Sequence, residues 1–284
     1  MGDYIIELKG VTKKFGKNTV LSSIDLNIPE GKITAIIGAS GEGKSTILKL
    51  ITSFYQPTKG KIYYSKNNIF KNITRIKKEF GSSIESGSFY DALTIKENLM
   101  YFGRLYKVDS KTLKKRVNRL MHFINLYNAR NVYAKNISLG MKKRLDLACA
   151  LINNPKVLIL DEPTADLDPL LRNQMLKIVK RINKNGTTVI FTTQLLEEVD
   201  EFCDNVAILY NEKIIEHGKV KNIKKKHHCS NMNCVFEKIF SRKGRKSYQE
   251  SIIVKTKLET EQEKKRLILS LMKKKGKKHR RNKK

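Results

Sequence analysis

The sequence has no run of apolar residues long enough to cross a bilayer. Its longer runs, such as Val157–Leu160 and Val206–Leu209, have the length of a buried β-strand, whereas a transmembrane helix needs about 20 residues. Residues 1–4 carry no basic group, so a secretory signal peptide is not expected. We therefore expect a chain that does not itself span a membrane.

Cysteine is scarce, with 4 residues in a chain of 284. This number excludes a disulfide framework and favours a reducing, cytoplasmic compartment. Cys149 and Cys203 lie in apolar helical contexts, so we interpret them as core residues.

Four potential metal ligands lie within eight residues: His227, His228, Cys229 and Cys234. Their spacing fits no standard zinc pattern well. We interpret the segment as an incidental linker, and metal binding stays as the alternative.

Acidic residues are also few, with 27 Asp and Glu against 58 Lys and Arg, a net charge of +31. Residues 1–218 carry 34 basic and 22 acidic groups, a net charge of +12, whereas residues 219–284 carry 24 and 5, a net charge of +19. The basic excess is therefore concentrated in the last quarter of the chain, which needs its own explanation.

Apolar residues make up 40% of the chain, which favours a packed globular body over wholesale disorder. The expected strands are Tyr4–Leu8, Thr19–Leu21, Ile24–Ile28, Ile33–Ile37, Lys156–Leu160, Thr187–Phe191 and Val206–Tyr210. Each of the last three follows a stretch in which apolar residues take a helical period. This alternation predicts an α/β body with a largely parallel sheet.

Residues 38–45 read Gly-Ala-Ser-Gly-Glu-Gly-Lys-Ser, a complete match to G-x-x-x-x-G-K-[ST] after an expected strand and before a helical pattern. Glycines let such a loop wrap phosphates with its N–H groups pointing inward, and the helix N-terminus adds positive charge. We expect Lys44 to reach the β- and γ-phosphates of ATP and Ser45 to ligate Mg²⁺. The expected binding set is Gly38, Ser40, Gly41, Gly43, Lys44, Ser45 and Thr46; the alternative is a Gly-rich turn that only caps a helix.

Two carboxylates, Asp161 and Glu162, follow the apolar run Val157–Leu160. A strand parallel to Ile33–Ile37 would deliver both beside the phosphates. Asp161 is then expected to hold the Mg²⁺ shell, and Glu162 to act as the base that polarises a water for attack on the γ-phosphate. The alternative is a strand end with acidic turn residues.

Five segments occur in an order and spacing similar to those of ABC-transporter ATPase subunits. They are the phosphate loop, Ser138-Leu139-Gly140, Asp161-Glu162-Pro163-Thr164, Leu167-Asp168-Pro169 and Thr192-Thr193-Gln194. The resemblance covers roughly residues 4–218. Among these proteins the chain looks most like the ATPases of exporters whose permeases are separate chains, such as the bacitracin and daunorubicin resistance pumps.

The resemblance assigns roles to residues outside the phosphate loop. Phe15, before Gly16, resembles the aromatic residue that stacks on adenine; its alternative is a core position. Ser138 and Gly140 resemble a signature motif that contacts ATP held by the opposite subunit, and Asp168 resembles a residue that links the two sites. A homodimer or a paired ATPase subunit, with two ATP molecules between the copies, is therefore implied.

Two positions depart from the family pattern. Glu85 stands where a Gln normally ligates Mg²⁺, and a carboxylate can still reach the ion through water. Gln194 stands where a His normally contacts the γ-phosphate, and Gln donates a hydrogen bond but cannot take up a proton. Because Lys44, Asp161 and Glu162 are retained, we expect a slow but real ATPase rather than an inactive protein.

The resemblance also implies an architecture: an α/β P-loop NTPase domain over residues 1–218 with a mostly parallel core sheet, an N-terminal antiparallel β subdomain and an inserted helical subdomain at about 87–150. In the family this subdomain docks on the permease. Phe89 and Tyr90 are candidates for the docking groove, and the alternative is that they belong to the core.

Residues 219–284 form a basic extension outside these motifs. Val235, Phe236, Ile239 and Phe240 suggest a short helix that packs back on the body, and residues 260–275 suggest a second one, followed by a disordered end. We consider three interpretations: a solvated tail, a contact with anionic membrane lipid, and a contact with nucleic acid, the last disfavoured by scarce aromatic residues.

The sequence thus predicts a peripheral ATPase subunit on the cytoplasmic face of a membrane, which powers export through a separate transmembrane permease. The alternative of a different class is a soluble ABC ATPase that acts on nucleic acid or ribosomes. Such proteins often carry two ATPase domains or long coiled-coil inserts, and this chain has neither.

Overall fold

The computed structural model describes residues 4–71, 73–84 and 88–243. The chain divides into two units, Met1–Met232 and Asn233–Lys284. Within the described residues of the second unit lies most of one helix, α9 (Met232–Lys243). That helix covers the segment 235–240 for which the sequence suggests one, whereas the helix suggested at 260–275 and the basic end lie outside the described residues.

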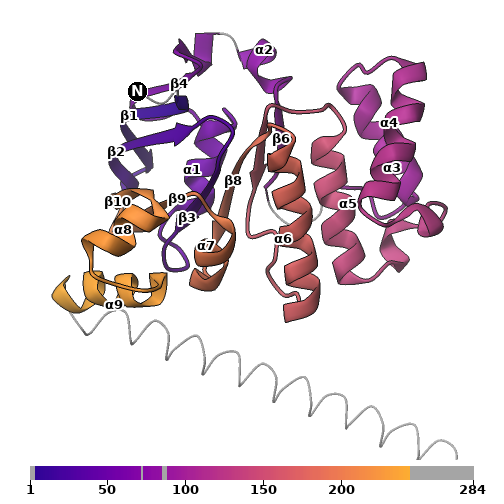
Figure 1. The fold of residues 1–284 in the computed structure, drawn as a ribbon. Helices are drawn as coiled ribbons and strands as arrows, with labels where there is room; N and C mark the ends of the chain where they lie inside the picture. The colour runs from indigo at the N-terminus through magenta and orange to yellow at the C-terminus, as the bar shows by residue number, and fades with distance from the viewer. Residues whose placement is uncertain (1–3, 72, 85–87, 244–284) are drawn as a thin grey trace, which may run out of the picture. The chain divides into compact units, whose positions relative to one another are not determined.

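A six-stranded sheet forms the centre of the first unit (Figure 1). Its strands, in spatial order, are β10 (Lys213–Lys219), β9 (Asn205–Tyr210), β3 (Ile33–Ile37), β8 (Thr188–Thr193), β7 (Val157–Leu160) and β6 (Phe80–Ser83). All neighbours run parallel except β10, which is antiparallel to β9. Strands β3, β7 and β8 are buried along their whole length, which explains the near-continuous apolar sequences of β3 and β7.

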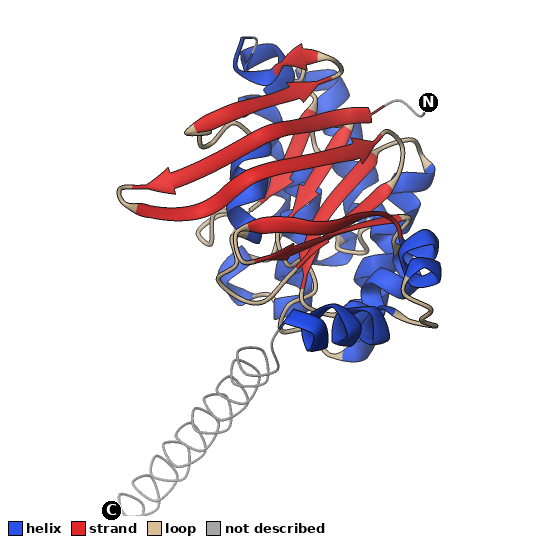
Figure 2. Ribbon diagram, turned by 90° about the vertical axis from the view of Figure 1, so that its left-hand side faces the viewer, coloured by secondary structure: helices blue, strands red, loops and turns tan. Residues whose placement is uncertain are grey.

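A second, antiparallel sheet has four strands in the order β2-β1-β4-β5. They are β1 (Tyr4–Phe15), β2 (Asn18–Pro29), β4 (Lys59–Tyr64) and β5 (Asn67–Asn68). Figure 2 shows the long strands of this sheet in front of the strands of the central sheet. Gly60 lets β1 and β4 approach closely, because a Cβ atom there would lie 2.3 Å from the carbonyl oxygen of Gly10.

The main core lies between the two sheets and includes helix α1 (Lys44–Ile51). Apolar residues of β1, β2, α1 and β4 pack there with residues of β6, β7, β8 and β9. Other elements of this unit are α2 (Ile73–Lys77), α6 (Pro169–Lys184), α7 (Leu196–Phe202), α8 (Val220–Lys226) and the short 3₁₀ turn η1 (Ile69–Lys71). Helices α6 and α7 pack against β8 and β3.

A helical region with its own core is inserted between β6 and β7. It contains α3 (Ile95–Leu105), α4 (Ser110–Phe123), α5 (Leu139–Leu151) and two 3₁₀ turns, η2 (Tyr127–Ala129) and η3 (Ala134–Asn136). Thr94 and Glu97 form a capping box at the start of α3, and Asp109 caps α4. Apolar residues of all three helices meet in a separate cluster. Among the described residues, no helix is long and apolar enough to cross a membrane.

The four cysteines differ in their state. Cys149 and Cys203 are free thiols, whereas Cys229 and Cys234 are disulfide-bonded. Both thiols of the alternative metal set are therefore oxidised, and the described residues contain no metal-binding group of three or more His, Cys, Asp or Glu.

Candidate active site

The carboxyl ends of three adjacent parallel strands bring the predicted residues together. Strand β8 lies between β3 and β7, with Thr193 beside Ile37 and Phe191 beside Leu160. The phosphate loop follows β3, Gln194 follows β8, and the two carboxylates follow β7. The edge of the central sheet where these strands end therefore carries the candidate site, as is usual in open α/β sheets.

The phosphate loop has the backbone that its glycines allow. Gly41 and Gly43 have φ values of +85° and +101°, a region that side chains with a Cβ rarely adopt. A Cβ on Gly38 would lie 2.6 Å from the carbonyl oxygen of Leu209, so only glycine fits there. Gly43 is the N-cap of α1 and makes no side-chain hydrogen bond, and the half-buried Ser45 and Thr46 lie in the first turn.

The Lys44 side chain is buried in this loop, with 5% of its surface exposed. Its ammonium group donates to the carbonyl oxygens of Gly38 at 3.0 Å and Ala39 at 2.9 Å. It also lies 3.9 Å from Oε1 of Glu162. The positive charge is thus held at the loop and faces the carboxylate that follows β7.

Asp161 and Glu162 are both held by the hydroxyl of Thr192 on β8. Thr192 Oγ1 donates to Oδ1 of Asp161 and accepts a hydrogen bond from the Glu162 N–H at 2.9 Å. Glu162 has a φ of +43°, so the chain turns sharply at this residue. One hydroxyl therefore fixes the backbone of one carboxylate residue and the side chain of the other.

Gln194 contacts the predicted base directly. Its Nε2 donates to Oε1 of Glu162 at 2.6 Å. The side chain of Glu162 is 36% exposed, so solvent reaches the pair. The same Glu162 oxygen faces Lys44, which means that the three predicted catalytic side chains form one connected group.

Asp168, Ser138 and Gly140 lie at two helix N-termini that pack together. Asp168 caps α6 by accepting a hydrogen bond from the Leu171 N–H at 2.9 Å, and Ser138 caps α5. A Cβ on Gly140 would lie 3.0 Å from Cδ1 of Leu171. The structure thus brings the signature-like segment beside the segment of Asp168.

Phe15 is at the end of β1, and 42% of its surface is exposed. Its ring meets the ring of Tyr55 edge to face, with centroids 5.1 Å apart, and the Lys13 ammonium lies 4.7 Å from its centroid. With this much of its surface exposed, Phe15 is not a core residue.

Glu85 lies outside the described residues, but both flanks of its segment contact a residue that the sequence analysis missed. Asp146 on α5 accepts hydrogen bonds from Ser83 Oγ and from the Ser88 N–H, the latter at 3.0 Å. Burial raises the pKa of its carboxyl, against the effect of these hydrogen bonds. In the sequence, Asp146 could have been noticed as the one acidic residue within the otherwise apolar stretch 145–151.

A second missed residue is Glu198 on α7, which is 3% exposed. It accepts hydrogen bonds from the hydroxyls of Thr164 and Thr193, and burial raises the pKa of its carboxyl. The sequence offers little indication of this role, because two adjacent glutamates look like an ordinary acidic surface. In the structure only the neighbour, Glu197, is exposed.

A family model described as ABC transporter matches residues 21–165, just over half of the chain. The chain belongs to the ABC transporter family. As an ABC ATPase it binds and hydrolyses ATP, in agreement with the phosphate loop and carboxylates at one sheet edge. The predicted fold, with an antiparallel sheet and a mostly parallel one, is confirmed.

Curated relatives of this ABC ATPase come from several transport systems. The methionine import ATP-binding protein MetN of Histophilus somni is 34% identical over 77% of this chain and 66% of that protein. The bacitracin transport ATP-binding protein BcrA of Enterococcus faecalis is 31% identical over 79% and 72%, respectively. The lantibiotic transport ATP-binding protein SrtF of Streptococcus pyogenes is 32% identical over 82% and 99%. The ABC ATPase thus spans two thirds of MetN and nearly all of SrtF.

A solved structure supports the same assignment. The dimeric ATP-binding cassette MJ0796, in a post-hydrolysis state bound to ADP and phosphate, superposes with a TM-score of 0.68 at 27% identity. The match covers 75% of this chain and 98% of that chain. The ABC ATPase therefore shares both fold and sequence with a cassette whose structure holds the products of ATP hydrolysis.

Proposed function

We propose that this ABC ATPase is the ATP-binding and ATP-hydrolysing subunit of an export-type transporter and powers a separate membrane permease. The observation that carries the site assignment is the connected group of Lys44, Glu162 and Gln194 at the edge of the central sheet. Export is supported by the similarity to BcrA and SrtF, which are named for bacitracin and lantibiotic transport. MetN is named for import, so the direction of transport needs its own test.

Binding of ATP would change the partners of Lys44. Its ammonium group now donates to two loop carbonyls, and phosphate oxygens are stronger, charged acceptors for it. The loop backbone and the start of α1 would hold the remaining phosphate charge, with Ser40 and Thr46 beside them. Phe15 would stack on the adenine through its exposed face.

Ser45 and Asp161 fit a magnesium ion that arrives with the nucleotide. A hydroxyl and one carboxylate are hard oxygen donors, and Mg²⁺ is typically held by one or two such groups together with substrate phosphates. When bound, the ion supplies charge that stabilises the leaving phosphates. Thr192 orients the Asp161 carboxylate for this role, and Glu85 is proposed as a further, water-mediated ligand.

Glu162 is the proposed general base. In the reaction a water oxygen bonds to the γ-phosphorus, the bond to the ADP oxygen breaks, and a proton of the water passes to the carboxylate, so that ADP and phosphate leave. Gln194 keeps the carboxylate in place through its amide N–H. Because the Gln amide does not take up a proton, the donor in this hydrogen bond stays the same on both sides of neutrality.

A complete site requires a second copy or a paired ATPase subunit. Ser138 and Gly140 lie at the start of α5 and Asp168 at the start of α6, where helix N-termini can meet the phosphates of a nucleotide on the opposite subunit. Gly140 packs against Leu171 beside Asp168. We propose that this shared surface, over both N-termini, faces the partner ATPase.

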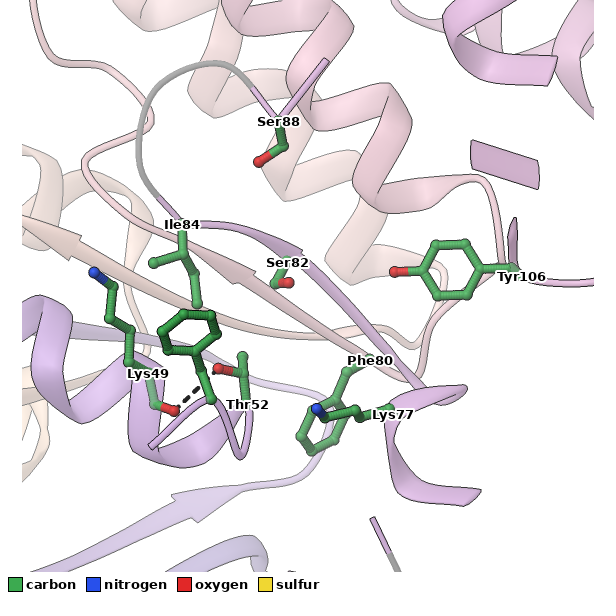
Figure 3. A pocket seen from close by; sticks show the side chains of 9 residues that line it. Lys49, Thr52, Lys77, Phe80, Ser82, Ile84, Ser88 and Tyr106 are labelled. Carbon is green, nitrogen blue, oxygen red and sulfur yellow. Dashed lines mark hydrogen bonds between the residues drawn. The ribbon is translucent and has the colours of Figure 1, made fainter. Parts of the chain in front are cut away.

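We propose that the permease docks at a hollow of about 400 Å³, which is lined in part by Ile84 and Ser88 (Figure 3). Its lining residues are Lys49, Thr52, Phe54, Lys77, Phe80, Ser82, Ile84, Ser88 and Tyr106. Phe54 is 70% exposed, so it offers an apolar anchor for a partner helix. Tyr90 is half-exposed, whereas Phe89 packs against the helical core, so Tyr90 is the better docking candidate of the two.

Phosphate release by the purified full-length chain tests the ATPase part. We expect Mg²⁺-dependent release that Lys44→Ala and Glu162→Gln abolish, whereas Asp166→Asn, at an exposed position near Glu162, leaves it unchanged. Release without Mg²⁺, or full release by Glu162→Gln, would contradict the assignment of the ion or of the base.

Detergent extraction tests the transporter part. We expect the chain to co-purify with a polytopic membrane protein, identified by mass spectrometry, and Phe54→Ser to weaken this association without a change in basal phosphate release. Association with ribosomes that RNase abolishes would contradict the transporter assignment.

The basic extension is proposed to contact anionic lipid on the cytoplasmic face of the membrane. Its net charge of +19 is the support, because each basic residue near an anionic surface contributes about 1 kcal/mol. The full-length chain should pellet with phosphatidylserine vesicles but not with neutral ones, and less after the basic residues of 273–284 are changed to Gln. Equal pelleting in all cases would remove the proposal.

A further inference from the structure

Glu198 is a buried carboxylate whose two oxygens contact two different segments of the site. Its Oε1 accepts a hydrogen bond from Thr164 Oγ1 at 2.6 Å, and its Oε2 accepts one from Thr193 Oγ1 at 2.6 Å. Thr164 follows Glu162 by two residues, and Thr193 directly precedes Gln194. The carboxylate therefore bridges the chain segments of the proposed base and of its hydrogen-bond donor.

A third segment reaches the same carboxylate through Arg172 on α6. Its Nε lies 3.9 Å from Oε1 of Glu198 and is buried without a hydrogen-bond partner. The Arg172 guanidinium also donates to the carbonyl oxygen of Leu167 at 3.3 Å. The backbone N–H of Arg172 donates to the carbonyl oxygen of Asp168 at 2.9 Å. The segment of Asp168 is thereby joined to the same group.

The hydroxyl of Thr193 has both of its hydrogen-bonding roles in use. It donates to Glu198 and accepts from the Leu195 N–H at 3.0 Å. Gln194 lies between these two attachment points, so the turn that carries it is fixed on both sides. Loss of the Glu198 carboxylate would release the hydroxyl and loosen that turn.

Stability alone gives a poor account of a carboxylate at this place. Desolvation of a buried charge is costly, and apolar residues of similar volume are often as stabilising or more so. The carboxylate oxygens face three polar groups, on Thr164, Thr193 and Arg172, and each lies within four residues of a different proposed site residue. Its polar contacts fit a role in geometry.

We propose that Glu198 is a positioning residue for ATP hydrolysis, which acts through Thr164 and Thr193 to hold Glu162 and Gln194 in register with each other and with the segment of Asp168. The inference rests on the proposed roles of these residues. The contacts of Glu198 with Thr164, Thr193 and Arg172 do not reach the phosphate loop. The positioning role therefore concerns the chemical step and not the binding of ATP.

Four variants of the full-length chain separate this role from a structural one. Glu198→Ala should lower kcat at least tenfold while the dissociation constant of a fluorescent ATP analogue changes less than twofold. Glu198→Gln should recover most of kcat, because an amide accepts from one hydroxyl and donates to the other. Glu197→Ala, at the exposed neighbour, is the matched control and should be unchanged. Thr193→Val should lower kcat like Glu198→Ala.

A double-mutant comparison tests the route. If Glu198 acts through Thr193, adding Thr193→Val to Glu198→Ala changes kcat less than twofold, whereas a further loss equal to that of the single Thr193 variant overturns the inference. A parallel loss of ATP binding, kcat and thermal midpoint in Glu198→Ala overturns it as well. Should Glu198→Ala not fold, Thr193→Val and Thr164→Val decide: wild-type kcat in both refutes the inference.

Glu162→Gln separates this inference from the proposed function. If Glu162→Gln hydrolyses ATP like the wild type, the base assignment fails, whatever the Glu198 variants do. If Glu162→Gln is inactive and Glu198→Ala keeps wild-type kcat, the positioning role alone fails.

Discussion

Thr192→Val tests the connection between β8 and the two carboxylates. The Thr192 side chain is fully buried, and its hydroxyl donates to Asp161 and accepts from the Glu162 N–H. Valine has a similar volume, so the change removes the hydroxyl and leaves no cavity. The loss is therefore one hydrogen bond to a charged acceptor and one partner of a backbone N–H.

The size of the effect follows from these two bonds. A hydrogen bond to a charged group contributes about 1.5–3 kcal/mol, and a buried N–H without a partner costs about 1–3 kcal/mol. Asp161 and Glu162 are half-buried, so water recovers part of the loss. We expect the free energy of unfolding to fall by about 2–4 kcal/mol, and kcat for ATP to fall with it.

Thr34→Val is the matched control on the adjacent strand β3. Thr34 is also buried, but its hydroxyl has no hydrogen-bond partner. Removal of an unpartnered buried hydroxyl should leave stability unchanged or raise it by about 1 kcal/mol. Urea unfolding at pH 7, followed by circular dichroism, measures both variants. A loss below about 0.5 kcal/mol for Thr192→Val, or equal losses for the two variants, would refute the reasoning.

Three further predictions address the nucleotide and pH. Gln194→His should give kcat a pH dependence near 6–7 that the wild type lacks, with lower rates on the acid side, because an imidazolium beside Glu162 weakens the base; parallel pH profiles would contradict this. Phe15→Ala should weaken ATP binding about tenfold through lost stacking, measured by titration of a fluorescent ATP analogue, and unchanged affinity would place adenine elsewhere. Burial raises the pKa of Asp146, so its contribution to stability is full below its ordinary pKa and is lost as pH rises through the raised value. The stability of the wild type relative to Asp146→Asn, measured by urea unfolding, should therefore fall as pH rises above about 4, the ordinary pKa of Asp, and a constant difference would contradict the cause.

Local sequence patterns were sufficient to predict a strand, a glycine-rich loop and a helix around residues 38–45, the strand Val157–Leu160 that precedes Asp161 and Glu162, and the α/β class. These features depend on the spacing of glycines and apolar residues within short segments, and each carries its signal within a few residues. The number of cysteines, by contrast, does not reveal that Cys229 and Cys234 are disulfide-bonded.

Contacts between distant segments are decided only by the tertiary structure. The order β3-β8-β7 places Gln194 against Glu162 and Lys44, although 150 residues separate the first and last of these in the sequence. Asp146 and Glu198 carry no motif, and each becomes recognisable because burial removes it from water and leaves a few hydroxyl and N–H groups as its partners. The sequence thus determines which chemical groups are present, and the packing of the sheet determines which of them interact, because hydrogen bonds depend on distance in space and not along the chain.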